Sequence, residues 1–69
     1  MRKEWGARSK QGKRILQCLA DGMDQEQIAT KLKLHPTTLR GQLLFIRGEL
    51  RATNTVHSVA IAMRLKIIK

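Results

Sequence analysis

Apolar residues recur every three or four positions along most of the chain, and the clearest run lies in HPTTLRGQLLFIRGEL, residues 35–50. The spacing i, i+4, i+7 and i+11 predicts a helix with one buried stripe, formed by Leu39, Leu43, Ile46 and Leu50. The other side of this helix is not simply polar. It carries two glycines and two large apolar residues beside a row of arginines: Gly41, Leu44, Phe45 and Gly48, with Arg40, Arg47 and Arg51. What such a face contacts is the main question that the pattern raises.

Two further helices are predicted before this one from their start and stop signals. The first begins at about Ser9, a favourable N-cap residue, and ends at Ala20, with Gly22 just beyond it. The second begins at Asp24, whose partner three residues on is Gln27, a capping-box pattern, and it ends near Lys33. Their expected buried residues are Ile15, Leu16 and Leu19 in the first helix, and Ile28 and Leu32 in the second.

The third helix is expected to begin with His35 as N-cap and Pro36 at the first helical position. It follows the second helix after a turn of only three residues, 33–35, with an apolar residue inside the turn. So short a connection is typical of a helix-turn-helix. A fourth helix is expected from Asn54 or Thr55 to about Leu65, and no segment shows the alternation of a strand. The predicted fold class is therefore all-α with four helices.

The fourth helix is apolar on two sides. One stripe, expected to face the core, contains Val56, Val59, Ala60 and Met63. The second stripe contains Ile61, Leu65 and Ile68, spaced i, i+4 and i+7. Because one helix of a small domain cannot easily bury both stripes, we expect the second to form a homodimer contact. In the alternative interpretation the short C-terminal tail folds over it.

Composition and charge restrict the function. The 69 residues suffice for one domain, and 14 Lys and Arg against 5 Asp and Glu give a net charge of +9. A charge of this size indicates an anionic partner, with nucleic acid favoured over a membrane surface. Cys18 is the only cysteine and is expected to be buried. No apolar run resembles a signal peptide or a membrane span, so a protein of the cytoplasm is expected. No catalytic constellation, metal site or cofactor motif is present, so we expect no enzyme.

The segment LADGMDQEQIATKLKLHPTTL, residues 19–39, resembles the LuxR/GerE-type DNA-binding domain. It matches the pattern L-A-x-G-x-x-x-x-x-I-A-x-x-L-x-I-S-x-x-T-V of that family, and the resemblance extends without gaps from about Arg8 to Ile68. It implies a four-helix helix-turn-helix domain, residues 9–69, preceded by a basic arm, residues 1–8, that is disordered or lies on DNA. It also implies a free-standing, GerE-like regulator that binds double-stranded DNA in a bacterial or phage-infected cell, associated with the nucleoid, and that pairs through its fourth helix.

The resemblance and the residue types together predict a DNA-binding set on the third helix and before it. Arg40 matches a family position that reaches base edges or phosphate, Gly41 matches a groove-facing position, and Gln42 replaces a frequent histidine. Arg51 replaces the family's turn glycine. Base contacts are expected from Arg40 with Gln42, Thr37 and Leu44, and phosphate contacts from Thr38, Lys31, Lys33, Arg47 and Arg51.

Leu44 and Phe45 depart from the family, which generally has polar or basic residues there. A leucine can contact a thymine methyl group, whereas Phe45 lies on another side of the helix. Phe45 is expected either to contact the N-terminal arm, for example at Trp5, or to anchor a protein partner. The leading hypothesis is a dimeric transcriptional regulator that binds specific DNA sequences. The alternative is a protein-binding adaptor or anti-regulator that engages a transcription factor or RNA polymerase through the outer face of the third helix.

Overall fold

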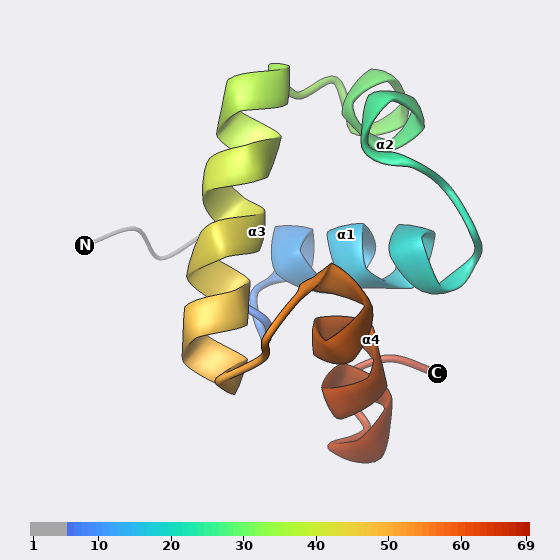
Figure 1. The fold of residues 1–69 in the computed structure, drawn as a ribbon. Helices are drawn as coiled ribbons and strands as arrows, with labels where there is room; N and C mark the ends of the chain where they lie inside the picture. The colour runs from blue at the N-terminus through green and yellow to red at the C-terminus, as the bar shows by residue number, and fades with distance from the viewer. Residues whose placement is uncertain (1–5) are drawn as a thin grey trace.

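The computed structural model describes residues 6–69, which form four α-helices and no strand. The helices are α1 (Lys10–Ala20), α2 (Gln25–Leu32), α3 (Pro36–Leu50) and α4 (Thr55–Arg64). In Figure 1, α3 runs along one side of the molecule, α2 lies beside its N-terminal end, and α1 and α4 fill the space beside the rest of it. The predicted all-α class, the four helices and their order are confirmed.

Each helix begins at the N-cap residue that local sequence predicts. The side chains of Ser9, Asp24, His35 and Asn54 each accept a hydrogen bond from a main-chain N–H of the first helical turn. Asp24 and Gln27 form both bonds of a capping box. These interactions span two or three residues, so they satisfy the first N–H groups of a helix without help from the tertiary structure.

All four helices end in one backbone arrangement, in which a residue of positive φ reverses the chain. The main-chain N–H after that residue donates to the carbonyl five positions earlier, as in a Schellman motif; these bonds join Met23 to Cys18, Leu34 to Ala29, Ala52 to Arg47 and Ile67 to Ala62. The reversing residues are Gly22, Lys33, Arg51 and Lys66. Three of the four positions that favour glycine therefore hold a basic residue. Arg51 adopts the turn conformation with φ 54° although its side chain has a Cβ.

The core consists of two clusters that share α1 and α3. One lies toward α4 and contains Ala7, Leu16, Ile46, Ala62, Ile67 and Ile68. The other lies toward α2 and contains Ile15, Cys18, Ile28, Ala29, Leu39 and Leu43. The predicted burial of Cys18 and of the α3 stripe is confirmed, with Leu50 packed at the edge of the first cluster. The two clusters fix one face of α3 and leave its opposite face outward.

The segment before α1 is also part of the folded chain. Ala7 is only 1 % exposed and belongs to the first core cluster, so the fold begins before the expected boundary between residues 8 and 9. Gly12 lies so close to this segment that a Cβ there would overlap the carbonyl oxygen of Gly6. The first turn of α1 and the segment before it therefore require glycine at position 12.

The predicted orientation of α4 is wrong. Val56 is 79 % exposed and Met63 and Ala60 are also exposed, whereas Ser58 and Ala62 are fully buried. The small side chains of Ser58 and Ala62 let α4 lie close against the core, and the Ser58 hydroxyl donates to the Asn54 carbonyl, 3.1 Å away. The stripe expected to face the core is therefore mostly exposed to solvent. The rotation of α4 about its axis follows from close packing at its small residues, and not from the size of its apolar side chains.

The chain after α4 turns back on the core. The helix ends at Arg64, Lys66 has φ 60°, and Ile67 and Ile68 are buried in the first cluster. Ile68 was expected to continue the outer stripe with Ile61 and Leu65, and this expectation is wrong, because the helical spacing does not continue past the turn. The tail folds back, as the alternative interpretation expected, but onto the first core cluster, and it leaves Leu65 uncovered. Of the expected dimer stripe, Leu65 stays exposed and Ile61 is half-buried.

Candidate nucleic-acid interface

A turn of three residues, 33–35, joins α2 to α3. Lys33 reverses the chain with φ 56°, Leu34 is half-buried against the second core cluster, and His35 caps α3. In Figure 1, α2 is seen almost along its axis while α3 lies across the view, so the two helices cross at a large angle. α3 is the longest helix and has one long side turned away from α1 and α2 (Figure 1).

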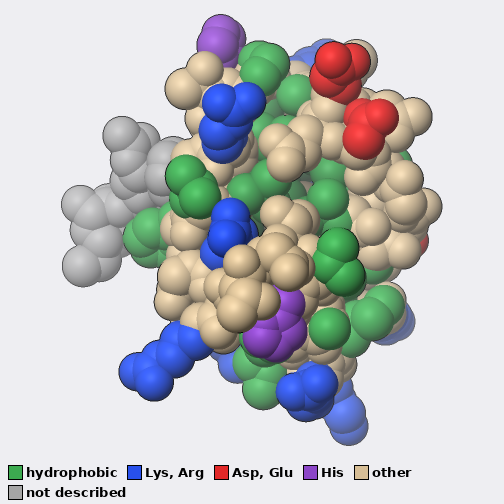
Figure 2. Space-filling view, in the orientation of Figure 1, with side chains coloured by type: hydrophobic (Ala, Val, Ile, Leu, Met, Phe, Trp, Pro, Cys, Tyr) green, Lys and Arg blue, Asp and Glu red, His purple; other side chains and the backbone are tan. Residues whose placement is uncertain are grey.

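The outward side of α3 divides into two stripes at helical spacing. The basic stripe contains Thr37, Arg40, Leu44, Arg47 and Arg51. The Phe45 stripe contains Thr38, Gly41, Phe45 and Gly48. Figure 2 shows Lys and Arg side chains over α3 and around its far end, hydrophobic side chains between them, and acidic side chains gathered over α2. Part of the positive charge of the chain therefore lies on the exposed face of α3.

Arg40 is the side chain of the basic stripe best placed to contact a partner. It is exposed, and within residues 6–69 its guanidinium makes no hydrogen bond or ion pair. A guanidinium has five donors in a fixed planar arrangement that suits a phosphate or the edge of a guanine. Thr37, one turn earlier, is exposed as well, although its main-chain N–H already donates to His35 Nδ1 at 3.1 Å.

Arg47 has a structural contact that the sequence did not indicate. Its Nη2 donates to the Thr53 carbonyl at 2.9 Å, and it is half-buried. Its Nε is buried and has no partner among the described residues. The side chain thus ties α3 to the connection that leads into α4, and only the rest of its guanidinium is available to an anion. Arg51, at the end of the stripe, is exposed.

Gln42 does not lie where a DNA-reading residue must lie. Its side chain is 1 % exposed, and its Nε2 donates to Gln11 Oε1 at 2.8 Å, which links α3 to α1. The expectation that Gln42 bonds a base or a phosphate is therefore wrong for this fold. The reason is its register, because position 42 lies between Leu39 and Ile46 at spacings of three and four residues, on the buried side of the helix.

The remaining predicted residues of α2, α3 and the turn between them are exposed or half-buried. Thr38, Lys31 and Lys33 are exposed, and Gly41 is half-buried on the outward side of α3. Leu44 is 56 % exposed and Phe45 is 46 % exposed. A Cβ at Gly48 would have no neighbour within 4 Å, so the fold itself does not require that glycine. The expected contact of Phe45 with Trp5 lies outside the described residues.

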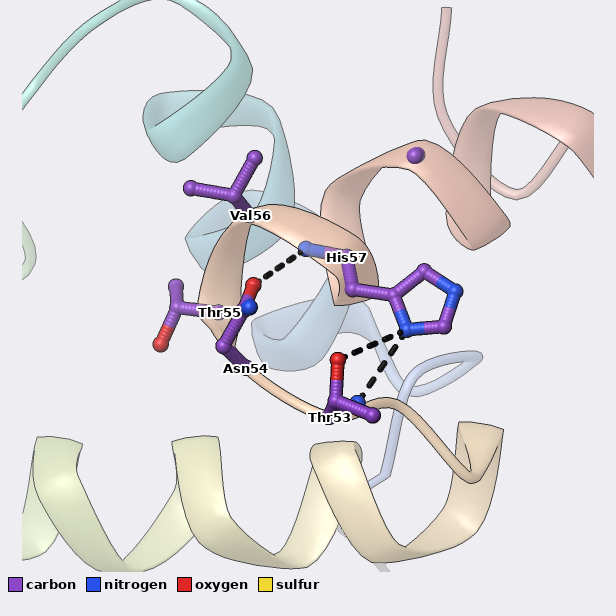
Figure 3. A pocket seen from close by; sticks show the side chains of 6 residues that line it. Thr53, Asn54, Thr55, Val56 and His57 are labelled. Carbon is purple, nitrogen blue, oxygen red and sulfur yellow. Dashed lines mark hydrogen bonds between the residues drawn. The ribbon is translucent and has the colours of Figure 1, made fainter.

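A shallow hollow lies beside the basic stripe, where α4 begins. It is lined by Thr53, Asn54, Thr55, Val56, His57 and Ala60. In Figure 3 the His57 ring turns toward Thr53, whose main-chain N–H donates to Nδ1 at 3.1 Å, while Val56 points away from this pair. Asn54 Oδ1 accepts from the His57 N–H at 2.8 Å. These bonds and the bond from Arg47 to the Thr53 carbonyl fix the connection between α3 and α4.

No helix among residues 6–69 is long and apolar enough to cross a membrane. No group of three or more His, Cys, Asp or Glu side chains in this part of the chain could hold a metal ion. Comparison with protein-family models, with curated proteins and with solved structures finds no match for the chain.

Proposed function

We propose that this protein is a transcriptional regulator that binds double-stranded DNA by placing α3 in the major groove. The observation that carries the proposal is the basic stripe, which lies on the exposed face of α3 and has an unengaged Arg40 near its start. A B-DNA major groove admits one α-helix, and its phosphates attract cations on the flanks of that helix. The order of helices agrees with the resemblance to the LuxR/GerE-type domain, to which we assign the chain as part of this proposal.

The residues of the proposed interface have two roles, contact with base edges and contact with phosphates. Arg40 would bind a guanine edge or a phosphate, and Thr37 would lie beside it near the start of α3. Lys31 and Lys33 would contact phosphate at the N-terminal end of α3, and Arg51 would do so at the other end. Gln42 has no part in the contact, because it is buried against Gln11.

We also propose that the protein binds an inverted repeat as a dimer that pairs through α4. The exposed apolar residues of α4 form a stripe of Val56, Ala60 and Met63. A second copy would remove this stripe from water, and a two-fold dimer would present two copies of α3 to two half-sites. Ile68 is excluded from such a contact by its burial.

The test is fluorescence anisotropy of a labelled random-sequence duplex titrated with the protein at several salt concentrations. We expect a steep fall of affinity with salt, with a slope of about −0.9 per phosphate contacted. Arg40→Gln is expected to weaken binding and to reduce the slope by about one. The matched control is Arg14→Gln, which removes an exposed arginine from α1 and should change both values much less. A folded sample that does not bind at low salt would contradict the proposal.

A second candidate function is a protein-binding adaptor or anti-regulator that contacts a transcription factor or RNA polymerase through the Phe45 stripe. The open space at Gly48 favours it, because the fold does not need a glycine there and a partner could approach closely. Phe45→Gln separates the two functions. DNA binding through the basic stripe predicts nearly unchanged affinity for a duplex, whereas the adaptor predicts that a regulatory activity is lost while DNA binding and helicity are kept.

A further inference from the structure

Leu44 occupies an unusual place for a leucine. It belongs to neither core cluster and is 56 % exposed, and its neighbours on the basic stripe are Arg40 one turn before it and Arg47 one turn after it. A single exposed apolar residue is ordinary in itself. Here, however, it lies in the middle of the row of cations, at the point that a nucleic acid bound along the stripe would cover.

The surroundings of Leu44 define the kind of group that would cover it. Arginines on both sides favour an anionic partner, and the leucine needs an apolar group at the surface of that partner. In the major groove of DNA, the C5-methyl group of thymine is the apolar group that a base pair presents, and it lies between two rows of phosphates. Charge and apolarity together therefore match thymine in a duplex better than an acidic protein surface, which places its charges without this regular spacing.

The geometry of the stripe also places Leu44 relative to Arg40. Residues four apart on a helix have Cβ atoms about 5–6 Å apart, and successive base pairs are about 3.4 Å apart along a strand. The two side chains would therefore address base pairs one or two steps apart. Arg47 is less suited to base contact than Arg40, because its Nη2 is bonded to the Thr53 carbonyl.

We propose that Leu44 is a specificity-determining residue that contacts the C5-methyl group of a thymine, next to or one pair beyond the base pair that Arg40 contacts. This inference rests on the proposed function, since it requires α3 to lie in the major groove. It adds a sequence preference that depends on one methyl group of the DNA. Deoxyuridine lacks only that methyl group and pairs as thymine does, so it isolates the contact.

The experiment begins with selection of preferred sites from a random duplex library by the wild-type protein. Each thymine of the selected site is then replaced singly by deoxyuridine, and affinities are measured for wild type, Leu44→Ala and Leu44→Gln. We expect one thymine per half-site whose replacement weakens wild-type binding about fourfold, the effect of losing one buried methyl group. In both variants the same replacement should have no effect, so the two changes are not additive.

The possible outcomes distinguish failure of the Leu44 contact from failure of DNA binding itself. Helicity of Leu44→Ala serves as the folding control, and it should be kept because alanine favours a helix and the site is exposed. If wild type binds DNA but no deoxyuridine replacement weakens it, or the loss is equal in Leu44→Ala, the inference alone is overturned. The same holds if the selected site contains no thymine, or if Leu44→Ala matches wild type on DNA and instead loses a protein partner. Failure to bind any duplex would overturn the inference and the proposed function together.

Discussion

The main-chain N–H of Ala7 donates a hydrogen bond to Glu49 Oε1, 2.7 Å away, across 42 positions of the sequence. Glu49 is in the last turn of α3, and Ala7 is buried in the core immediately before α1. The bond therefore fastens the start of the folded chain to the end of the helix that we propose binds DNA. It also explains a carboxylate on a helix that otherwise carries arginines.

Removal of this carboxylate should destabilise the fold. We expect Glu49→Ala to lower the free energy of unfolding by about 1.5–3 kcal/mol, because the partly buried Ala7 N–H loses a charged acceptor. Glu49→Gln is the matched control, since its amide oxygen can still accept the bond, and it should cost clearly less. Urea denaturation followed by circular dichroism measures both. Equal stability of Glu49→Ala and wild type would show that the bond contributes nothing.

Two glycines should respond to alanine in opposite directions. Gly12→Ala should destabilise strongly, because its Cβ would overlap the Gly6 carbonyl oxygen. Gly48→Ala should stabilise by about 1 kcal/mol, because alanine favours a helix and there is open space around position 48. Thermal unfolding of the two variants beside wild type checks the pair. The expectation is wrong if the two alanines shift the melting temperature in the same direction.

The basic residues at positive φ should show a conflict between stability and binding. Lys33→Gly, Arg51→Gly and Lys66→Gly should each raise stability by about 1 kcal/mol, because glycine adopts positive φ without a Cβ penalty. The first two should also weaken DNA binding and reduce its salt dependence by about one phosphate contact each. Lys66→Gly is the control, because Lys66 lies beyond α4 and outside the proposed interface. Denaturation titrations measure the stability of each variant, and anisotropy titrations measure its affinity for the duplex. Unchanged DNA binding in Lys33→Gly and Arg51→Gly would show that Lys33 and Arg51 do not contact DNA.

The buried amide of Gln42 should be replaceable without harm to DNA binding. Its Oε1 is buried and has no partner within residues 6–69, so Gln42→Leu removes an unsatisfied acceptor, and Gln11 is exposed enough to bond water instead. We expect stability equal to or above that of wild type and unchanged affinity for the duplex. A loss of affinity in a folded Gln42→Leu sample would show that Gln42 contacts DNA, which its buried position argues against.

A dimer through α4 should depend on the exposed stripe. Val56→Glu and Met63→Glu should each shift the protein from dimer to monomer in sedimentation velocity, because a charge would then face the partner's apolar surface. Leu65→Glu, at an exposed apolar position just after the end of α4, is the control and should leave the dimer intact. Loss of the dimer only in Leu65→Glu would show that the dimer contact lies at Ile61 and Leu65, as the sequence first indicated.

Local sequence determined where the helices begin and which side of α3 is buried. Asp24 and Gln27 are three residues apart, and the stripe from Leu39 to Leu50 repeats with the helical period, so interactions over a few residues already specify these features. The exposure of Arg40 and Leu44 follows from the same period, which is why most of the candidate interface could be predicted.

Tertiary structure alone decided which way α4 faces, where the tail goes and which polar side chains are buried. The apolar residues of α4 allow two rotations, and close packing at Ser58 and Ala62 selects one of them. Gln42 is polar and was expected to face outward, but its partner Gln11 is 31 positions away, and local sequence contains no sign of that pairing. The bond from Ala7 to Glu49 is equally invisible in sequence, because contacts between distant segments exist only after α1 and α3 have packed together.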